Sequence, residues 1–172
     1  DKEINGRRMK FEFSMMTYQS ETGIQTATLM KQCLDKIGVI CHVKPTEFTV
    51  MEQKDQDHEF DAAMGGWGTS TDPYTSKNLY ATGENRNYGQ YANPRVDELF
   101  EQGERERDQA KRAEIYGQIH QILWDDQPYT WLFYRAAFHA YNKKMRGYSF
   151  SPKGPYDFSP GFSSYYVPAD AL

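Results

Sequence analysis

A helix-length amphipathic segment between two short apolar segments constrains the fold of this chain most strongly. Residues 22–37 carry apolar side chains at helical spacing, and Gly38 follows where a glycine commonly ends a helix. Residues 9–18 and residues 39–43 have the short apolar pattern of strands, and Pro45 is predicted to end the second strand. This order is typical of two parallel strands joined by a helical crossover. The sequence therefore predicts an α/β domain, with a mixed sheet and flanking helices.

Three further helices are predicted from apolar spacing and capping residues. Residues 48–57 have the composition of a short, polar surface helix. Asn93, followed by Pro94, is a predicted cap at the start of the next helix. Asp108 begins a longer helix that is expected to end at Asp126.

The remaining segments are predicted to be strands, a loop and a tail. Residues 60–66 and the aromatic residues 129–138 have the pattern of buried strands, whereas residues 80–93 lack periodicity. Loops of that length are commonly functional or mobile. We expect one domain over residues 1–172, in which residues 143–172 form an irregular tail that packs on the rest.

Composition and residue spacing exclude several function classes. The net charge of −4 gives no support for a nucleic-acid partner, and no apolar run has the length of a membrane span. Cys33 and Cys41 lack metal or redox spacing, and we expect free, buried thiols at core-facing positions rather than a disulfide. The four histidines also lack the spacing of a zinc site. We therefore expect no catalytic residues, metal or cofactor.

The predicted strand at residues 60–66 leads directly into a glycine-rich segment with a tryptophan. Gly65, Gly66 and Gly68 would let another backbone approach closely. Trp67 offers a large flat surface. Asp72 before Pro73 predicts a helix N-cap. The segment is suited to holding an extended ligand, although a strand, a tight turn and a core tryptophan would explain it too.

Several short motifs follow one another along almost the whole chain. They are Phe60-Asp61-Ala62-Ala63, Gly66-Trp67-Gly68, Asp72-Pro73, Asn87-Tyr88, Asn93-Pro94-Arg95-Val96-Asp97, Arg112-Ala113-Glu114-Ile115-Tyr116 and Asp125-Asp126-Gln127-Pro128. In this order they resemble the C-terminal lobe of bacterial extracellular solute-binding proteins of the peptide/nickel-binding family. These proteins are the capture components of ABC importers.

The resemblance implies a function in transport without catalysis. It implies one lobe of the two-lobed, type II periplasmic-binding-protein architecture, with a small peptide or peptide-like solute held between the lobes. The partners implied are the missing N-terminal lobe and an ABC permease in the membrane, with no nucleic acid. The implied location is periplasmic or extracellular, and a lipoprotein anchor in the full-length protein is left open.

The same resemblance implies a set of ligand-binding residues around the glycine-rich segment. They are Gly65, Gly66, Trp67, Gly68, Ser70, Asp72, Tyr74, Arg86, Asn87 and Tyr88. Peptide-binding members commonly have an aspartate three residues after this tryptophan, where it pairs with the α-amine of the ligand. Ser70 occupies that position here, so a charge-assisted bond to a peptide amine is lost. Binding of a nickel chelate or another non-peptide solute is the alternative within the family.

Two alternatives belong to other function classes. A hydrolase domain could use Asp72, or the Asp125-Asp126 pair, as catalytic carboxylates. However, adjacent residues on a helix do not face each other. A structural or signalling domain without a small ligand is the second alternative. Trp124 and Trp131 are expected in the core, whereas Trp67 is expected to face an open cleft.

Overall fold

The computed structural model describes residues 2–4, 6–68, 70–148 and 161–171. The chain divides into two compact units, Asp1–Pro128 and Tyr129–Leu172. The packing of residues 143–172 on the rest of the chain stays a prediction, and residues 149–160 and 172 of that tail lie outside the described residues.

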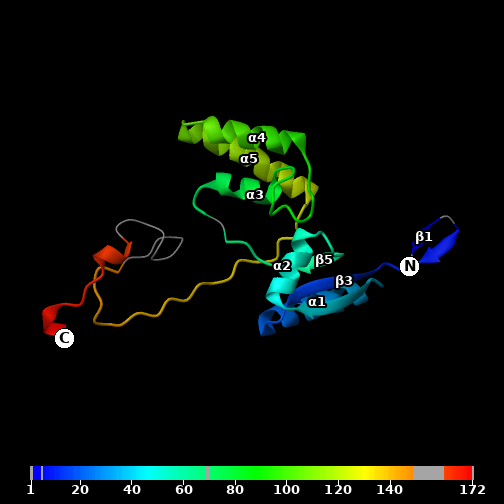
Figure 1. The fold of residues 1–172 in the computed structure, drawn as a ribbon, viewed down its shortest axis with the longest axis horizontal. Helices are drawn as coiled ribbons and strands as arrows, with labels where there is room; N and C mark the ends of the chain where they lie inside the picture. The colour runs from blue at the N-terminus through cyan, green and yellow to red at the C-terminus, as the bar shows by residue number, and fades with distance from the viewer. Residues whose placement is uncertain (1, 5, 69, 149–160, 172) are drawn as a thin grey trace. The chain divides into compact units, whose positions relative to one another are not determined.

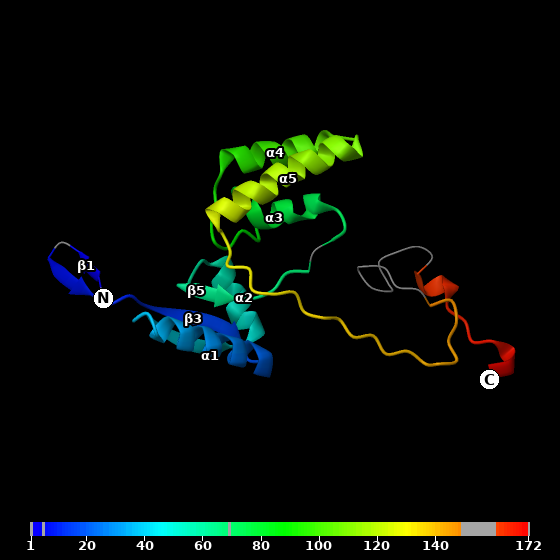
Figure 2. The same ribbon diagram turned by 180° about the vertical axis from the view of Figure 1, so that it is seen from behind.

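The first unit contains a small parallel sheet (Figure 1). Strand β3 (Glu12–Tyr18) is central, with β4 (Ile40–Thr46) on one side and β5 (Ala62–Met64) on the other. Both pairings are parallel. Helix α1 (Glu21–Asp35) connects β3 to β4 and lies along the sheet in both views (Figures 1 and 2). The α/β class and the parallel strand–helix–strand unit are confirmed. The sheet was predicted to be mixed, but both of its described pairings are parallel.

Gly38 ends the crossover helix in the way that its position predicts. Its φ angle is 78°, in the left-handed region that favours glycine. The Gly38 N–H donates to the Asp35 carbonyl and the Val39 N–H to the Leu34 carbonyl, both at 3.1 Å. These two bonds form a Schellman motif, which satisfies carbonyls that the helix leaves unpaired.

The predicted first two strands differ from the observed ones in their bounds. Residues 9–18 do not form one strand, because a separate antiparallel pair, β1 (Lys2–Ile4) and β2 (Arg7–Met9), precedes β3. Pro45 does not end β4 but pairs within it, opposite Thr17. Proline is tolerated there because β4 is an edge strand of this sheet, where one side needs no ladder bond.

The sheet and α1 enclose a first hydrophobic core, which contains the fully buried Ala27 and Cys41. Cys33 was predicted to be buried too, but it is exposed. It precedes Leu34 in the helix, so its side chain points about 100° away from the stripe that packs on the sheet. Ile37 is also exposed, because α1 ends two residues before it. Both cysteines are free, as predicted.

The helices after the first core follow the predicted order, with the addition of α3, which was not predicted. They are α2 (Phe48–Gln56), the 3-10 helix η1 (Pro73–Ser76), α3 (Lys77–Tyr80), α4 (Pro94–Arg105) and α5 (Gln109–Asp126). Asn93 and Asp108 are the N-caps of α4 and α5 and accept backbone N–H bonds, as predicted. Figure 1 shows α4 and α5 side by side. No helix in the described part of the chain has the length and apolar content needed to cross a membrane.

A second hydrophobic core lies between α4 and α5. Val96, Leu99 and Phe100 of α4 are fully buried there, with Ile119 and Leu123 of α5. These positions agree with the predicted apolar stripes. Trp124 was expected in the core but is 60% exposed. It follows Leu123 directly and therefore points away from the stripe that faces α4.

The second unit has little regular structure. Residues 129–138 were predicted to form a buried strand, but the structure assigns no strand to them, and Tyr134 and Phe138 are each 92% exposed. Trp131, also expected in the core, is 44% exposed. An apolar segment becomes a strand only when its backbone pairs with a neighbour. None of the described strands pairs with this segment. The described secondary structure of this unit consists of an Arg146–Tyr166 bridge, η2 (Gly161–Ser164) and η3 (Ala169–Ala171).

Candidate ligand-binding site

The predicted glycine-rich segment leaves the sheet at the end of an edge strand. Strand β5 is shorter than predicted and pairs with β3 on one side, and its other side has no partner strand in the described sheet. The next residues, 65–68, are exposed. A Cβ added at Gly66 or Gly68 would meet no atom within 4 Å, so packing does not require glycine at either position. The backbone at residues 65–68 is therefore open to another molecule.

Trp67 lies in a cluster with two other predicted site residues. Its ring centroid is 5.6 Å from that of Tyr88, at an interplanar angle of 46°. The Arg86 Cζ atom lies 5.6 Å from the Trp67 ring centroid, in a cation–π arrangement. Trp67 is 37% exposed and does not belong to either hydrophobic core. The alternative explanation of this segment included Trp67 as a core residue, and that part of it is wrong.

A small cavity of about 130 Å³ opens beside this cluster. The residues that line it are Trp67, Gly68, Ser70, Thr75, Asn78, Leu79 and Arg86. Four of these were predicted site residues, so the structure brings Trp67, Gly68, Ser70 and Arg86 together. Thr75, Asn78 and Leu79 were missed, because they lie on η1 and α3, where no sequence motif marks a ligand contact.

A larger cavity of about 820 Å³ lies between the end of α2 and the loop that follows α3. The predicted site residues Arg86, Asn87 and Tyr88 line this cavity, and Arg86 lines the small cavity too. His58, just after α2, has a left-handed φ of 57°, and its Nδ1 lies 3.0 Å from the Tyr88 carbonyl oxygen. His58 therefore holds the loop that carries Tyr88, a role that the sequence did not predict.

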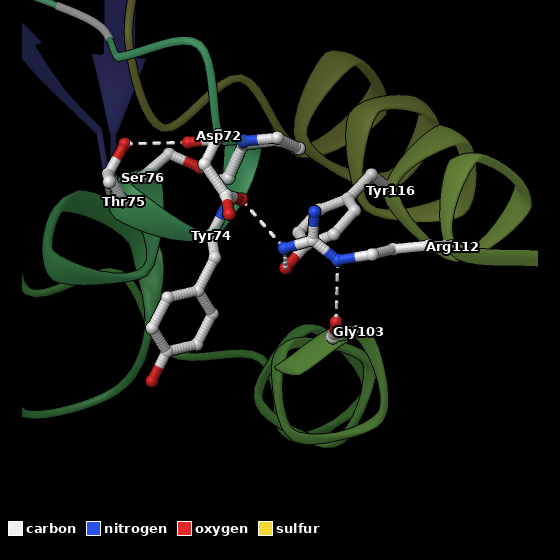
Figure 3. A network of polar contacts seen from close by, with 8 residues as sticks. Asp72, Tyr74, Thr75, Ser76, Gly103, Arg112 and Tyr116 are labelled. Carbon is white, nitrogen blue, oxygen red and sulfur yellow. Dashed lines mark hydrogen bonds and ion pairs between the residues drawn. The ribbon is translucent and has the colours of Figure 1, made fainter. Parts of the chain in front are cut away.

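Asp72 has a structural role in addition to its predicted capping role. Its Oδ1 accepts the Tyr74 N–H at 2.9 Å and an Arg112 Nη2–H bond at 2.6 Å. Arg112 lies on α5 and also donates from Nε to the Gly103 carbonyl of α4 (Figure 3). The hydrogen bond from Arg112 and that from the Tyr74 backbone lower the pKa of Asp72. The ion pair ties the segment after Trp67 to both long helices.

Besides Asp72, two more of the predicted site residues are placed elsewhere or already engaged. Tyr74 lines neither cavity, and its ring points away from Arg112 in Figure 3. The Lys77 Nζ atom lies 5.7 Å from its ring centroid. Asn87 is buried, and its carboxamide donates to the Ala81 and Tyr91 carbonyls and accepts the Tyr91 N–H. Asn87 therefore organises the loop rather than offering its side chain to a ligand.

The carboxylates considered for catalysis are used in structural hydrogen bonds. Asp126 accepts from the Tyr91 hydroxyl at 2.5 Å and from Asn93 Nδ2 at 2.9 Å. Burial, together with this bond to Asp126, raises the pKa of Tyr91 to about 12. Asp125 instead accepts from Gln121, one turn earlier on α5. Among the described residues, no group of three or more His, Cys, Asp and Glu could hold a metal ion.

Tyr18 is a further residue near the site that the sequence did not predict. It is the last residue of β3, and its hydroxyl oxygen lies 3.4 Å from where a Cβ of Gly65 would be. Its ring stacks on Phe48 of α2, with centroids 5.7 Å apart. Ligands of parallel α/β sheets commonly bind beyond the carboxyl ends of the strands. The position of Tyr18 at the carboxyl end of an apolar strand was therefore the sequence signal that could have identified it as a site residue.

The fold of this chain is shared with a recognised class of binding proteins. The chain is similar in sequence and fold to part of oligopeptide- and dipeptide-binding proteins, and the resemblance seen in the sequence is confirmed. No family model matches the chain. The oligopeptide-binding protein AppA of Bacillus subtilis is 29% identical over 84% of this chain and 27% of its own length.

Two further comparisons agree with this class. A probable D,D-dipeptide-binding periplasmic protein of Escherichia coli, DdpA, is 28% identical over 73% of this chain and 25% of its own length. The solved structure of Bacillus subtilis AppA in complex with a nonapeptide superposes with a TM-score of 0.78 at 26% identity. That match covers 96% of this chain and 33% of the AppA chain. The chain thus spans about a quarter of the length of these curated relatives.

Proposed function

We propose that this chain is the C-terminal lobe of a longer solute-binding protein, which captures an oligopeptide or peptide-like solute for an ABC importer. The relatives named as peptide-binding proteins support this proposal. Capture needs no catalysis, and the engagement of Asp72 and Asp126 in hydrogen bonds of the fold agrees with a binding function. The relatives that were compared are binding proteins rather than enzymes.

The observation that carries the proposal is the open backbone beyond an edge strand. The side of β5 that faces away from β3 has no partner strand in the described sheet. Residues 65–68, which follow β5, are exposed. An extended peptide can pair with such a backbone as an added strand. Trp67, Arg86 and Tyr88 then supply a wall of side chains beside it.

The proposed partners follow from this role. An N-terminal lobe would complete the cleft, and closure of the two lobes on the ligand would signal to a membrane permease. The proposed location is periplasmic or extracellular, which agrees with a relative named as a periplasmic protein. We propose a lipid anchor as an optional feature of the full-length protein.

Native mass spectrometry of the full-length protein tests the proposal directly. We expect peptides to co-purify and to exchange with a synthetic peptide library. Peptides N-methylated at alternate positions should bind about tenfold or more weakly, because each lost N–H removes a backbone bond of the added strand. A nickel chelate or another non-peptide solute as the bound species, with no peptide retained, would overturn peptide capture in favour of the alternative cargo.

A further inference from the structure

The small cavity beside Trp67 has an unusual charge character for a site that is open to solvent. Arg86 is the one charged residue among the seven described residues that line it. The other six are aromatic, aliphatic, hydroxyl-bearing or amide-bearing residues or glycine. No Asp or Glu is among these seven. Within the described lining of this cavity, Arg86 therefore has no carboxylate beside it.

The contact between Arg86 and Trp67 leaves the guanidinium able to bind a further group. Its Cζ atom lies over the Trp67 ring, 5.6 Å from the ring centroid, a distance at which the ring attracts the guanidinium charge. The N–H groups of a guanidinium point outward in its plane and match the two oxygens of a carboxylate. Within the described part of the chain, no ion pair joins Arg86 to a carboxylate.

Three other carboxylates in this part of the chain are engaged or line the other cavity. Asp72 forms an ion pair with Arg112. Glu52 and Glu84 line the larger cavity, which therefore repels an anionic group more than the small cavity does. These positions leave the small cavity as the favourable side of Arg86 for an anion.

Resting on the peptide-binding function proposed above, we propose that Arg86 binds a carboxylate of the ligand in the small cavity. Trp67 holds the guanidinium in place, and the open backbone at residues 65–68 lies next to the cavity through Gly68. A volume of about 130 Å³ is roughly four times the share of one water molecule in the liquid, which suits a single carboxylate-bearing group. The carboxylate belongs either to the peptide C-terminus or to an Asp or Glu side chain of the peptide.

A three-part peptide library, offered to the full-length protein, tests this assignment and separates the two sources. One set has a free C-terminus and no acidic side chain, the second is C-terminally amidated with one Asp or Glu, and the third is amidated without acidic residues. Native mass spectrometry measures which peptides are retained. We expect one of the first two sets to bind at least about tenfold more tightly than the third, and the preferred set identifies the source of the carboxylate.

Substitutions of Arg86 connect the preference to this residue. Arg86→Gln should abolish the preference for the peptides that carry a carboxylate, while peptides of the third set still bind. Arg86→Lys keeps the positive charge and should therefore retain part of this preference. The matched control is Arg107→Gln, since Arg107 is exposed between α4 and α5 and lines neither cavity. Peptide binding with no preference for a carboxylate, or a preference that survives Arg86→Gln, would overturn the role of Arg86 and leave the proposed peptide binding standing. If no peptide of any set binds, the proposed function fails and this inference fails with it.

Discussion

At the scale of single residues, Trp67 is the side chain on which ligand binding is expected to depend most. It contacts Tyr88 and Arg86 rather than either hydrophobic core. In the full-length protein, Trp67→Ala should remove a central aromatic contact that costs roughly 2–4 kcal/mol of binding free energy. Titration calorimetry with a retained peptide should therefore show binding weakened by about 30-fold or more.

A second tryptophan provides the control for this prediction. Trp124 is more exposed than Trp67 and lies on α5, outside both cavities. Trp124→Ala should leave peptide affinity unchanged, while each variant keeps a cooperative thermal transition. If Trp67→Ala unfolds the protein but peptide binding per folded molecule stays the same, Trp67 serves stability and not the ligand.

The ion pair between Asp72 and Arg112 predicts a dependence of stability on pH. The pKa of Asp72 is lowered in the folded chain, chiefly by the bond from Arg112. Its stabilising effect is therefore fully present above the unfolded pKa of about 4 and is lost as the pH falls through the lower folded pKa. Asp72→Asn keeps a good N-cap but removes the charge. The difference in unfolding free energy between wild type and this variant should shrink as the pH falls below about 4.

Urea unfolding at a series of pH values measures this difference. In an Arg112→Gln background, Asp72→Asn should have a much smaller pH-dependent effect, because the main cause of the lowered pKa is gone. A pH dependence that is equally large in both backgrounds would show that the ion pair is not its source. That result would leave the capping of η1 as the contribution of Asp72 to stability.

At the scale of elements, the contact between α4 and α5 depends on a glycine. A Cβ at Gly103 would lie 2.8 Å from Cζ of Tyr116, whose ring is held under the Arg112 guanidinium at 5.0 Å. Overpacking of this kind costs about 1–3 kcal/mol. The gain in helix propensity from Gly to Ala is about 1 kcal/mol. We therefore expect Gly103→Ala to destabilise the chain, as measured by urea unfolding.

Gly117 is the matched control on the facing helix. It is exposed on α5, and a Cβ there would meet no atom within 4 Å. Gly117→Ala should therefore stabilise the chain by about 0.5–1 kcal/mol. In a Tyr116→Ala background, Gly103→Ala should become neutral or stabilising, because the clash is removed. If Gly103→Ala stabilises the otherwise unchanged chain as much as Gly117→Ala does, the two helices can separate without cost.

The helices were predicted well because their signals are local in the sequence. Asn93 and Asp108 cap the backbone two or three residues ahead, and the apolar stripe of α4 depends on spacing within one helix. The strand expected at residues 129–138 was wrong, because strand formation depends on a partner elsewhere. Cys33 was misplaced for a similar reason, since the width of the buried stripe depends on what covers it.

The candidate site was predicted in part. Trp67, Gly68, Ser70 and Arg86 line one cavity, although Arg86 is separated from Trp67 by η1, α3 and a loop. The buried, structural role of Asn87 could not be read from its motif, because asparagine serves turns and ligands alike. His58 and Arg112 act through contacts that are 30 and 40 residues apart in the sequence, which no local pattern contains.

At the scale of the whole molecule, we expect the chain to fold alone. Its first unit contains two hydrophobic cores, one between α1 and the sheet and one between α4 and α5. Chains of this length bury enough apolar surface to form a stable domain. Differential scanning calorimetry should show a cooperative transition, and a broad, non-cooperative melt would contradict this expectation.

Affinity should separate the isolated chain from the full-length protein. The chain offers one open backbone edge and the Trp67, Arg86 and Tyr88 cluster, whereas a two-lobed protein encloses its ligand from both sides. Binding to one surface still carries the entropic cost of immobilising a flexible peptide. The isolated chain should therefore bind a peptide with a millimolar or weaker dissociation constant, which corresponds to a binding free energy of about 4 kcal/mol at most.

Nuclear magnetic resonance titration of the isolated chain, with the peptide that the full-length protein retains, measures this weak binding. Chemical-shift changes should concentrate at residues 65–68 and at Arg86 and Tyr88, with Gly117 as an unaffected reference on α5. Changes confined to the exposed residues 130–138 would place the ligand on the second unit and contradict the site. Affinity equal to that of the full-length protein would contradict a cleft shared by two lobes, because one lobe would then supply the whole binding energy.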